Sequence, residues 1–329
     1  MRIPPTIRVD LDDIVASVGD QLVANRLLEP ARNLLDQMGQ QLASLPDHLR
    51  DVIPCAVEAS VGEGPRREAE AWSRLIGRPW REILIANCNY DLFMAGGLTP
   101  LLCSVLILPT PQGPVFGRNL DWHPRNELAS ASCRLEYSRG GRKLFEAAGW
   151  PGAIGAVTGL SHNGFGLALN YPCGSGCDFN PKGWPVLLLI RSLLEEAGSY
   201  AEALERLRRQ KITCPGLFTL AGGSNTEMAV VEHQGDDARV HPPKAPRGVR
   251  VPRIVATNHF GGEDGFCVRY QRLAGEAFRD LEPESPVSDG EIFRVLESVM
   301  LPDMTANHVV MRPRDRRMEL RVPAEVTGR

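Results

Sequence analysis

The stretch that decides the fold begins at Cys103-Ser104-Val105 and returns at Gly117-Arg118-Asn119-Leu120-Asp121-Trp122. Residues 103–108 are rich in apolar and β-branched side chains, a composition that predicts a buried strand. The turn-forming sequence Pro-Thr-Pro-Gln-Gly-Pro follows at residues 109–114, and Val115-Phe116 then resumes the strand pattern. Together these parts predict a β-hairpin with its turn near Gln112-Gly113.

Such a hairpin brings Cys103 close to Arg118 across the two strands. A guanidinium beside a thiol favours the thiolate, the form of cysteine that acts as a nucleophile. Asp121 can hold the same cation or accept a hydrogen bond from an amine. The residues alone leave a second interpretation open, in which Cys103 is a small buried side chain and Arg118 and Asp121 form an ordinary ion pair.

The chain changes character near residue 102. Before it, apolar residues recur at spacings of three and four over residues 11–45, which predicts a helix there. Residues 66–76 and 80–90 are expected to be helical as well. The sequence therefore predicts an N-terminal segment that is mostly helical.

After residue 102, short strand patterns alternate with glycine-bearing turns. Residues 153–158 and 166–170 are expected to pair as a second hairpin, with Asn163-Gly164 as its turn signal. Helices are expected at residues 186–209 and 288–299, where apolar side chains form a stripe. The whole pattern predicts an α+β protein.

A cysteine that opens a strand, followed by Gly-Arg-Asn-Leu-Asp-Trp, resembles the choloylglycine hydrolase group of N-terminal-nucleophile (Ntn) hydrolases. The similarity is strongest to the acid ceramidase and N-acylethanolamine acid amidase branch, with penicillin acyltransferases as cousins. Further motifs are similar and follow in the family's order: Gly-Leu-Ser-His-Asn-Gly-Phe-Gly-Leu-Ala-Leu-Asn-Tyr-Pro at residues 159–172, Val-Ala-Thr-Asn-His at 255–259 and Arg-Tyr-Gln-Arg-Leu at 269–273.

The resemblance implies a four-layer αββα Ntn-hydrolase sandwich with a helical N-terminal α-segment. It also implies that the precursor cleaves itself between Leu102 and Cys103. Residues 1–102 would then be an α-subunit or pro-segment, and residues 103–329 a β-subunit that carries the catalytic core. The two parts would form an α/β heterodimer, and a higher oligomer is left open.

The resemblance further implies that Cys103 is both the nucleophile and the new N-terminus. Its α-amine, with a reference pKa of ~7.7–8.0, would serve as the general base without a histidine. Asp121 would orient this amine, and Arg118 would polarise the thiol.

Three later residues complete the implied site. Asn170 and Asn258 match the asparagines that would donate to the oxyanion of the tetrahedral intermediate. Arg269 is the preferred match to a late arginine of the family, and Arg272 is the alternative.

The function implied by these matches is that of an autoprocessed cysteine amidase. It would hydrolyse the linear amide bond of a small-molecule N-acyl amine, such as a fatty-acyl amide, an N-acylethanolamine or a ceramide, through a Cys103 thioester. An acyltransferase that hands the acyl group to an amine acceptor passes through the same thioester and is the first alternative. A non-catalytic binding protein that retains the fold is the second.

Composition argues against several other classes of protein. The 37 Lys and Arg residues against 40 Asp and Glu residues give a formal charge of −3, so a nucleic-acid partner is not expected. The closest cysteine pair, Cys173 and Cys177, lacks a second pair at zinc-site spacing, and no phosphate-loop motif occurs. No metal or cofactor is therefore expected.

The N-terminal sequence has no apolar core of a signal peptide, and no apolar run approaches ~20 residues. Both features favour a cytoplasmic protein, and because the lysosomal signal and glycosylation sites that the resemblance implies are missing, we expect a bacterial or otherwise cytosolic relative. The N-terminal helices nevertheless offer an apolar face. Core packing is its simplest role, and a transient contact with a membrane or micelle that delivers lipid substrate is a second one.

Overall fold

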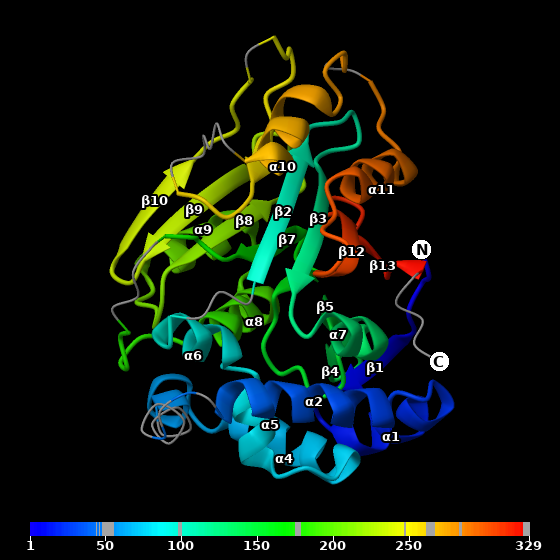
Figure 1. Ribbon diagram of the computed structural model, residues 1–329, viewed down its shortest axis with the longest axis vertical. Helices are drawn as coiled ribbons and strands as arrows, with labels where there is room; N and C mark the ends of the chain where they lie inside the picture. Colours follow the sequence, from blue (N-terminus) through cyan, green and yellow to red (C-terminus); the bar gives the residue numbers. More distant parts are fainter. Residues whose placement is uncertain are drawn as a thin grey trace.

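Two β-sheets packed face to face form the centre of the computed structural model (Figure 1). The structure describes residues 1–43, 45, 47, 56–97, 101–174, 179–246, 248–260, 267–282 and 285–324. The larger sheet has eight strands, and all its neighbouring pairs are antiparallel except β1 and β4 at one edge. In spatial order these strands are β1 (Thr6–Asp10), β4 (Cys133–Arg139), β5 (Arg142–Gly149), β6 (Thr158–Ser161), β7 (Phe165–Asn170), β8 (Gly216–Ala221), β9 (Met228–Gln234) and β10 (Asp237–His241).

The smaller sheet has five antiparallel strands and contains the predicted hairpin at its centre. Its spatial order is β11 (Ile254–Ala256), β2 (Leu101–Leu108), β3 (Val115–Trp122), β12 (Thr305–Arg312) and β13 (Arg317–Arg321). The hairpin β2–β3 is confirmed, with Cys103 opposite Leu120 and Val105 opposite Arg118. Because residues opposite one another share a face of a sheet, Cys103 and Arg118 lie on the same face as diagonal neighbours.

That shared face is the one that meets the larger sheet. Val105, Ile107 and Phe116 pack there against Leu160 and Ala168 of the other sheet, and all five are buried. Side chains alternate along a strand, so Cys103 points into the interface between the sheets, at the end of this apolar layer.

Helices cover both outer faces, which confirms the predicted four-layer αββα sandwich. The larger sheet carries α8 (Val186–Glu196) and α9 (Tyr200–Arg209), and the smaller sheet carries α11 (Asp289–Ser298) and the short α10 (Val268–Gln271) with the adjoining π-helical turn η1 (Arg272–Glu276). Gly117 of β3 permits the close approach of α11, since a Cβ atom there would lie 2.5 Å from Ile292 Cγ2. The glycine before Arg118 is thus a packing requirement.

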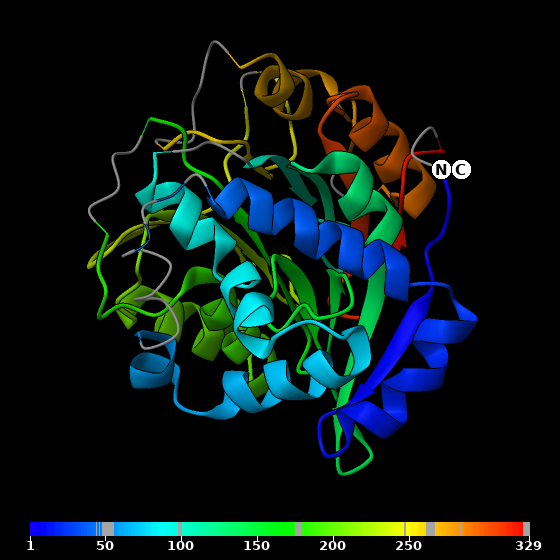
Figure 2. The same ribbon diagram turned by 60° about the horizontal axis from the view of Figure 1, so that its bottom comes forward.

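The N-terminal helices lie across one end of the sandwich (Figure 2). They are α1 (Ile14–Ala24), α2 (Leu28–Ala43), α4 (Gly64–Ile76), α5 (Trp80–Ala86) and α6 (Asn89–Ala95), and α7 (Arg125–Ala131) packs beside α2. The prediction of one helix over residues 11–45 is wrong, because Arg26 adopts φ 54° and interrupts it. Residues 80–90 likewise divide at Asn87-Cys88 into α5 and α6.

Two predictions in the later part also need correction. The helix expected over residues 186–209 ends at Glu196, and Ser199 starts a new one by accepting a hydrogen bond from the Glu202 N–H group. The strand expected at residues 153–158 instead begins at Thr158, although its hairpin partner and the Asn163-Gly164 turn are confirmed. The β4–β5 hairpin has no counterpart among the predicted elements.

The N-terminal segment contributes a strand as well as helices. Strand β1 adds a parallel edge to the larger sheet, and Arg2 and Val322 exchange two backbone hydrogen bonds of 2.8 Å. Across the described ranges, no helix combines the length and the apolar character needed to span a bilayer.

Candidate active site

The sulfur and the backbone nitrogen of Cys103 are each held by a hydrogen bond. It is fully buried near the start of β2. Its Sγ atom accepts a hydrogen bond from Arg118 Nη2 at 3.0 Å, and its backbone N–H group donates to Asn258 Oδ1 at 3.0 Å. The predicted proximity of the thiol and the guanidinium is therefore present in the structure.

Arg118 is fully buried and fixed by neutral groups. Its Nη1 donates to Val157 O at 2.8 Å and to the Thr158 hydroxyl, and its Nη2 donates to Leu169 O at 2.5 Å. Burial raises the pKa of the Cys103 thiol, and the Arg118 cation acts in the opposite direction. A buried cation held by carbonyl groups is best stabilised by a nearby anion, and the thiolate of Cys103 would be that anion.

Asp121 pairs with Arg269 rather than with Arg118. Its Oδ2 atom lies 3.0 Å from Arg269 Nη1, and its Oδ1 atom accepts a hydrogen bond of 2.5 Å from the Thr305 hydroxyl. The carboxylate is fully buried, and this burial raises its pKa to about 6, against the opposing effects of Thr305, Arg269 and Arg118.

Arg269 joins the parts of the cluster. Its Nη1 atom donates to Cys103 O at 3.1 Å, Ser104 Oγ at 3.0 Å and Asp121 Oδ2 at 3.0 Å, while its Nη2 atom donates to Asn258 Oδ1 at 3.0 Å. One guanidinium thus fixes the carbonyl, the carboxylate and the amide that surround the Cys103 nitrogen.

Arg272 does not reach this cluster. It donates to Ser298 O at 2.6 Å and lies 3.8 Å from Glu276, with about half of its side chain exposed. Of the two candidates for the late arginine, only Arg269 contacts the cysteine.

The two asparagines differ in the donors they have free. Asn258 uses one side-chain N–H on Tyr171 O at 2.7 Å, and within the described residues its second N–H makes no hydrogen bond. Asn170 donates to Ala256 O at 3.2 Å and to Thr257 O at 2.7 Å, and its buried Oδ1 atom meets no donor in the part of the chain that the structure describes. Donation by Asn170 to an oxyanion would therefore require one of these two bonds to break.

The junction between Leu102 and Cys103 lies inside β2, where Leu102 is opposite Asp121. The strand is continuous across the bond in this state. The Asp121–Arg269 pair consequently lies next to the peptide group that self-cleavage would break.

Comparison with known proteins identifies the family. A sequence model described as acyl-coenzyme A:6-aminopenicillanic acid acyl-transferase matches residues 109–283, more than half of the 329-residue chain. The chain belongs to this family. It is an Ntn-hydrolase family, as the resemblance of the Cys103 and Gly117–Trp122 motifs predicted.

Curated relatives and a solved structure agree with this membership. The chain is 28% identical over 247 residues to an acid ceramidase of Balaenoptera acutorostrata scammoni, covering 67% of this chain and 60% of the relative. It is 26% identical over 254 residues to the acid ceramidase of Mus musculus, covering 70% of this chain and 58% of the relative. The chain thus spans about 60% of the length of these relatives.

An N-acylethanolamine-hydrolyzing acid amidase (NAAA) ortholog of Caenorhabditis elegans superimposes with a TM-score of 0.56 at 19% identity. The match covers 67% of this chain and the whole of that structure. This likeness confirms the Ntn-hydrolase fold.

Within this Ntn-hydrolase fold, three hydroxyl groups support the cluster without having been predicted. Thr158 accepts from Arg118, Thr305 donates to Asp121, and Ser104 accepts from Arg269. No spacing rule in a single sequence marks Thr158 or Thr305, because Thr305 meets Asp121 through pairing of the distant strands β12 and β3, and Thr158 meets Arg118 across the interface between the two sheets. Of the three, Ser104 alone has a local signal, because it directly follows Cys103.

Over the described ranges, no three His, Cys, Asp or Glu side chains gather in a way that could hold a metal ion. Cys173 is a free thiol, and Cys177 lies outside the residues that the structure describes.

Proposed function

We propose that this chain is an autoprocessed cysteine amidase that hydrolyses the linear amide bond of a small-molecule N-acyl amine. The observation that carries the proposal is the pair of contacts at Cys103: Arg118 on the sulfur and Asn258 on the nitrogen. A nucleophile that also becomes an N-terminal amine needs both atoms to be held. Ntn family membership and the names of the acid ceramidase relatives support the same chemistry.

The first step is activation. One water molecule is added across the Leu102–Cys103 peptide bond, which leaves a carboxylate on Leu102 and an α-amine on Cys103. The products are an α-subunit of residues 1–102 and a β-subunit of residues 103–329. Asp121 lies opposite Leu102 on the neighbouring strand and pairs with Arg269, so this ion pair is the nearest charged group to assist the cleavage.

In the second step the new amine acts as the general base. It takes the thiol proton, the thiolate attacks the substrate carbonyl, and the proton passes to the departing amine as the amide C–N bond breaks. Arg269 bonds Asn258 Oδ1 beside this nitrogen. A nearby cation disfavours protonation of the amine, and the neutral amine is the form that can accept a proton.

Stabilisation of the oxyanion and hydrolysis of the thioester complete the reaction. The second N–H of Asn258 donates one hydrogen bond to the oxyanion. Asn170 donates another after one of its hydrogen bonds to a backbone carbonyl breaks. Water then attacks the thioester, which releases the carboxylic acid and returns the proton to Cys103. No cofactor or metal enters these steps.

The intact mass of the purified protein tests this proposal. The wild type should appear as two fragments, the larger beginning at Cys103, and the Cys103→Ala variant should remain one chain. The cleaved enzyme should hydrolyse N-acyl amines, and the variant should not. An uncleaved wild type that still hydrolyses these amides would overturn the N-terminal-amine mechanism.

Acyl transfer is the second candidate, and the description of the matching family favours it. It differs from hydrolysis only in the group that attacks the thioester. Adding an amine acceptor to the cleaved enzyme separates the two: transfer gives a new amide, whereas hydrolysis gives only the free acid.

We place the enzyme in the cytoplasm of a bacterial cell, which fractionation tests.

A further inference from the structure

Separate elements carry the two groups that meet beside the Cys103 nitrogen. Strand β11 leads to Asn258, and α10 with the adjoining η1 carries Arg269. The two residues are joined by the hydrogen bond of 3.0 Å from Arg269 Nη2 to Asn258 Oδ1. The geometry of the cysteine cluster therefore depends on how α10 and η1 are held against β11.

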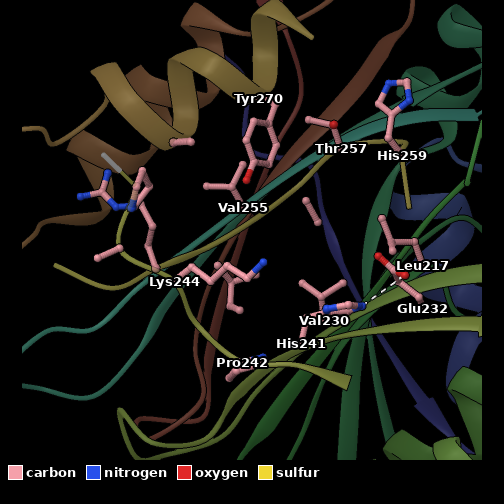
Figure 3. A pocket seen from close by; sticks show the side chains of 16 residues that line it. Leu217, Val230, Glu232, His241, Pro242, Lys244, Val255, Thr257, His259 and Tyr270 are labelled. Carbon is pink, nitrogen blue, oxygen red and sulfur yellow. Dashed lines mark ion pairs between the residues drawn. The ribbon is translucent and has the colours of Figure 1, made fainter. Parts of the chain in front are cut away.

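The short helix α10 has little burial of its own. None of its four residues is buried. A cavity of about 350 Å³ is lined by Thr257, which follows β11, and by Tyr270 of α10 (Figure 3). Apolar side chains become fully buried only in η1, at Leu273 and Ala274. The position of α10 therefore depends strongly on what holds η1 and the turn after it.

Arg253 holds that turn. It directly precedes β11 and is 2% exposed. Its Nη1 atom donates to Ala277 O at 2.5 Å and its Nη2 atom to Phe278 O at 3.1 Å, the two residues that follow η1. The Ala277 N–H group donates in turn to Arg272 O at 2.7 Å, three residues after Arg269. A short series of hydrogen bonds thus runs from Arg253 to the helical segment that carries Arg269.

The surroundings of Arg253 make it a rigid support. Its Nε atom donates to Val251 O at 3.4 Å, and its backbone exchanges hydrogen bonds of 3.1 and 2.9 Å with the backbone of Lys244. Burial lowers the pKa of the guanidinium to about 10, so it stays charged at neutral pH. Charged donors form hydrogen bonds roughly twice as strong as neutral donors do, and the planar guanidinium fixes their direction.

We propose that Arg253 is a positioning residue that sets the place of Arg269 in the cysteine cluster. It ties the start of β11 to the end of η1, while the bond from Arg269 to Asn258 ties the same two elements at their other ends. Without Arg253 the end of η1 loses two hydrogen bonds, and Arg269 shifts with it. The effect on catalysis rests on the proposed amidase function, whereas the effect on the place of Arg269 does not.

The thiol of Cys173 reports the place of Arg269 without any catalysis. Cys173 is half-buried, and its backbone N–H group donates to Asn258 O at 2.6 Å. Burial raises the pKa of its thiol, the Arg269 cation acts in the opposite direction, and Cys267 and Cys103 add to the effect of burial. The rate of alkylation by iodoacetamide against pH measures this pKa, and fragmentation mass spectrometry assigns the label to Cys173.

The variants are compared in the Cys103→Ala protein, which should remain one chain. Arg269→Met should raise the pKa of Cys173, because it removes the cation. Arg253→Met should raise it as well, and the double variant should raise it no further than Arg269→Met alone, since Arg253 acts through Arg269. An unchanged pKa in Arg253→Met, or two shifts that add in the double variant, would overturn the proposal.

Two more variants separate positioning from a general loss of structure. Arg253→Lys keeps a charged donor without the planar fork, so its shift should have the same direction and a smaller size. Urea unfolding checks that each protein is folded, and Arg253→Lys carries the comparison if Arg253→Met is not. Arg312→Met is the matched control, because Arg312 is also buried and bonds Asp289 and Val287 O beside the start of α11. An equal shift of the Cys173 pKa in this control would contradict a specific role of Arg253.

Kinetics of the cleaved enzyme test the effect on catalysis. Arg253→Met should lower kcat per cleaved chain on the order of 10²-fold, the cost of a misplacement of about 1 Å, with little change in KM. Arg312→Met should leave kcat in place. An unchanged kcat in Arg253→Met beside a shifted Cys173 pKa would overturn the role in catalysis alone. A shifted pKa in a protein that hydrolyses no N-acyl amine would overturn the amidase function and leave the positioning of Arg269 intact.

Discussion

Two opposing effects act on the pKa of the Asp121 carboxyl, and a hydrogen bond from Thr305 is one of them. Burial raises the pKa of the Asp121 carboxyl, while the hydrogen bond from the Thr305 hydroxyl is the largest effect that lowers it. The proposed mechanism needs the ionised carboxylate, which pairs with Arg269 beside the amine. Activity should therefore fall as the pH drops through the pKa of Asp121.

Replacing Thr305 by valine tests this reasoning. The Thr305→Val variant keeps the side-chain shape but loses the hydroxyl, so the pKa of Asp121 should rise above about 6 and the acid limb of kcat/KM should move to higher pH. The pH profile of amide hydrolysis measures the shift. Thr219→Val is the matched control, because the buried Thr219 hydroxyl makes no hydrogen bond to any described residue. An acid limb that stays in place in Thr305→Val would show that Asp121 does not set it.

At the scale of single residues, the sequence could bring Cys103 and Arg118 together because both lie on one hairpin. Spacing and turn chemistry determine that pairing locally. The sequence could not show that Asp121 pairs with Arg269, or that Asn170 has both of its N–H groups engaged. Those bonds depend on how β11, α10 and β12 approach β2 and β3, which is a property of the assembled sandwich.

Between elements, Asp91 links the N-terminal segment to the part of the chain after residue 102. This fully buried residue of α6 accepts hydrogen bonds from the Val186 N–H group at the start of α8, at 3.0 Å, and from the Thr213 hydroxyl. Burial raises the pKa of the Asp91 carboxyl to about 6. The folded protein therefore binds a proton at Asp91 more readily than the unfolded chain does, whose carboxyl has a pKa near ~4.

This difference makes stability depend on pH. Between about pH 4 and pH 6 the native state holds the extra proton, so the contribution of Asp91 to the free energy of unfolding falls as the pH rises. Asp91→Asn cannot titrate but keeps an oxygen acceptor. The free energy of unfolding of this variant, measured relative to that of the parent, should rise by on the order of 2–3 kcal/mol as the pH is raised from about 4 to about 7.

Urea unfolding at several pH values measures the gain, with both proteins in the Cys103→Ala background so that each is one chain. A difference in stability that does not change with pH would contradict the prediction.

Element boundaries show where prediction from sequence reaches its limit. The apolar stripe over residues 186–209 continues across Ala197, so periodicity alone favours one helix. The break follows from Ser199, whose hydroxyl caps α9 and lets it turn onto a different part of the sheet. The β4–β5 strands were missed because charged side chains interrupt them, since one face of this hairpin carries an ion-pair cluster around Glu136.

Across the whole molecule, the segment before residue 102 is built into the fold of the segment after it. Strand β1 is hydrogen-bonded along β4 at the edge of the larger sheet. The Asn87 side chain donates to Gly152 O at 2.8 Å and accepts from the Ile154 N–H group at 2.7 Å. Trp72, Ile83 and other side chains of the N-terminal helices belong to one buried apolar cluster with side chains of the core.

These contacts predict that self-cleavage does not release the N-terminal segment. No contact in this set includes the Leu102–Cys103 bond, so cutting that bond leaves them intact, and burial of the shared apolar cluster holds the fragments together. Cleaved wild type should elute as one species in size-exclusion chromatography and give two bands under denaturing conditions. Cys103→Ala should elute at the same position and give one band. Separation of the wild-type fragments in buffer without denaturant would show that the N-terminal segment is a removable pro-segment rather than a subunit of the enzyme.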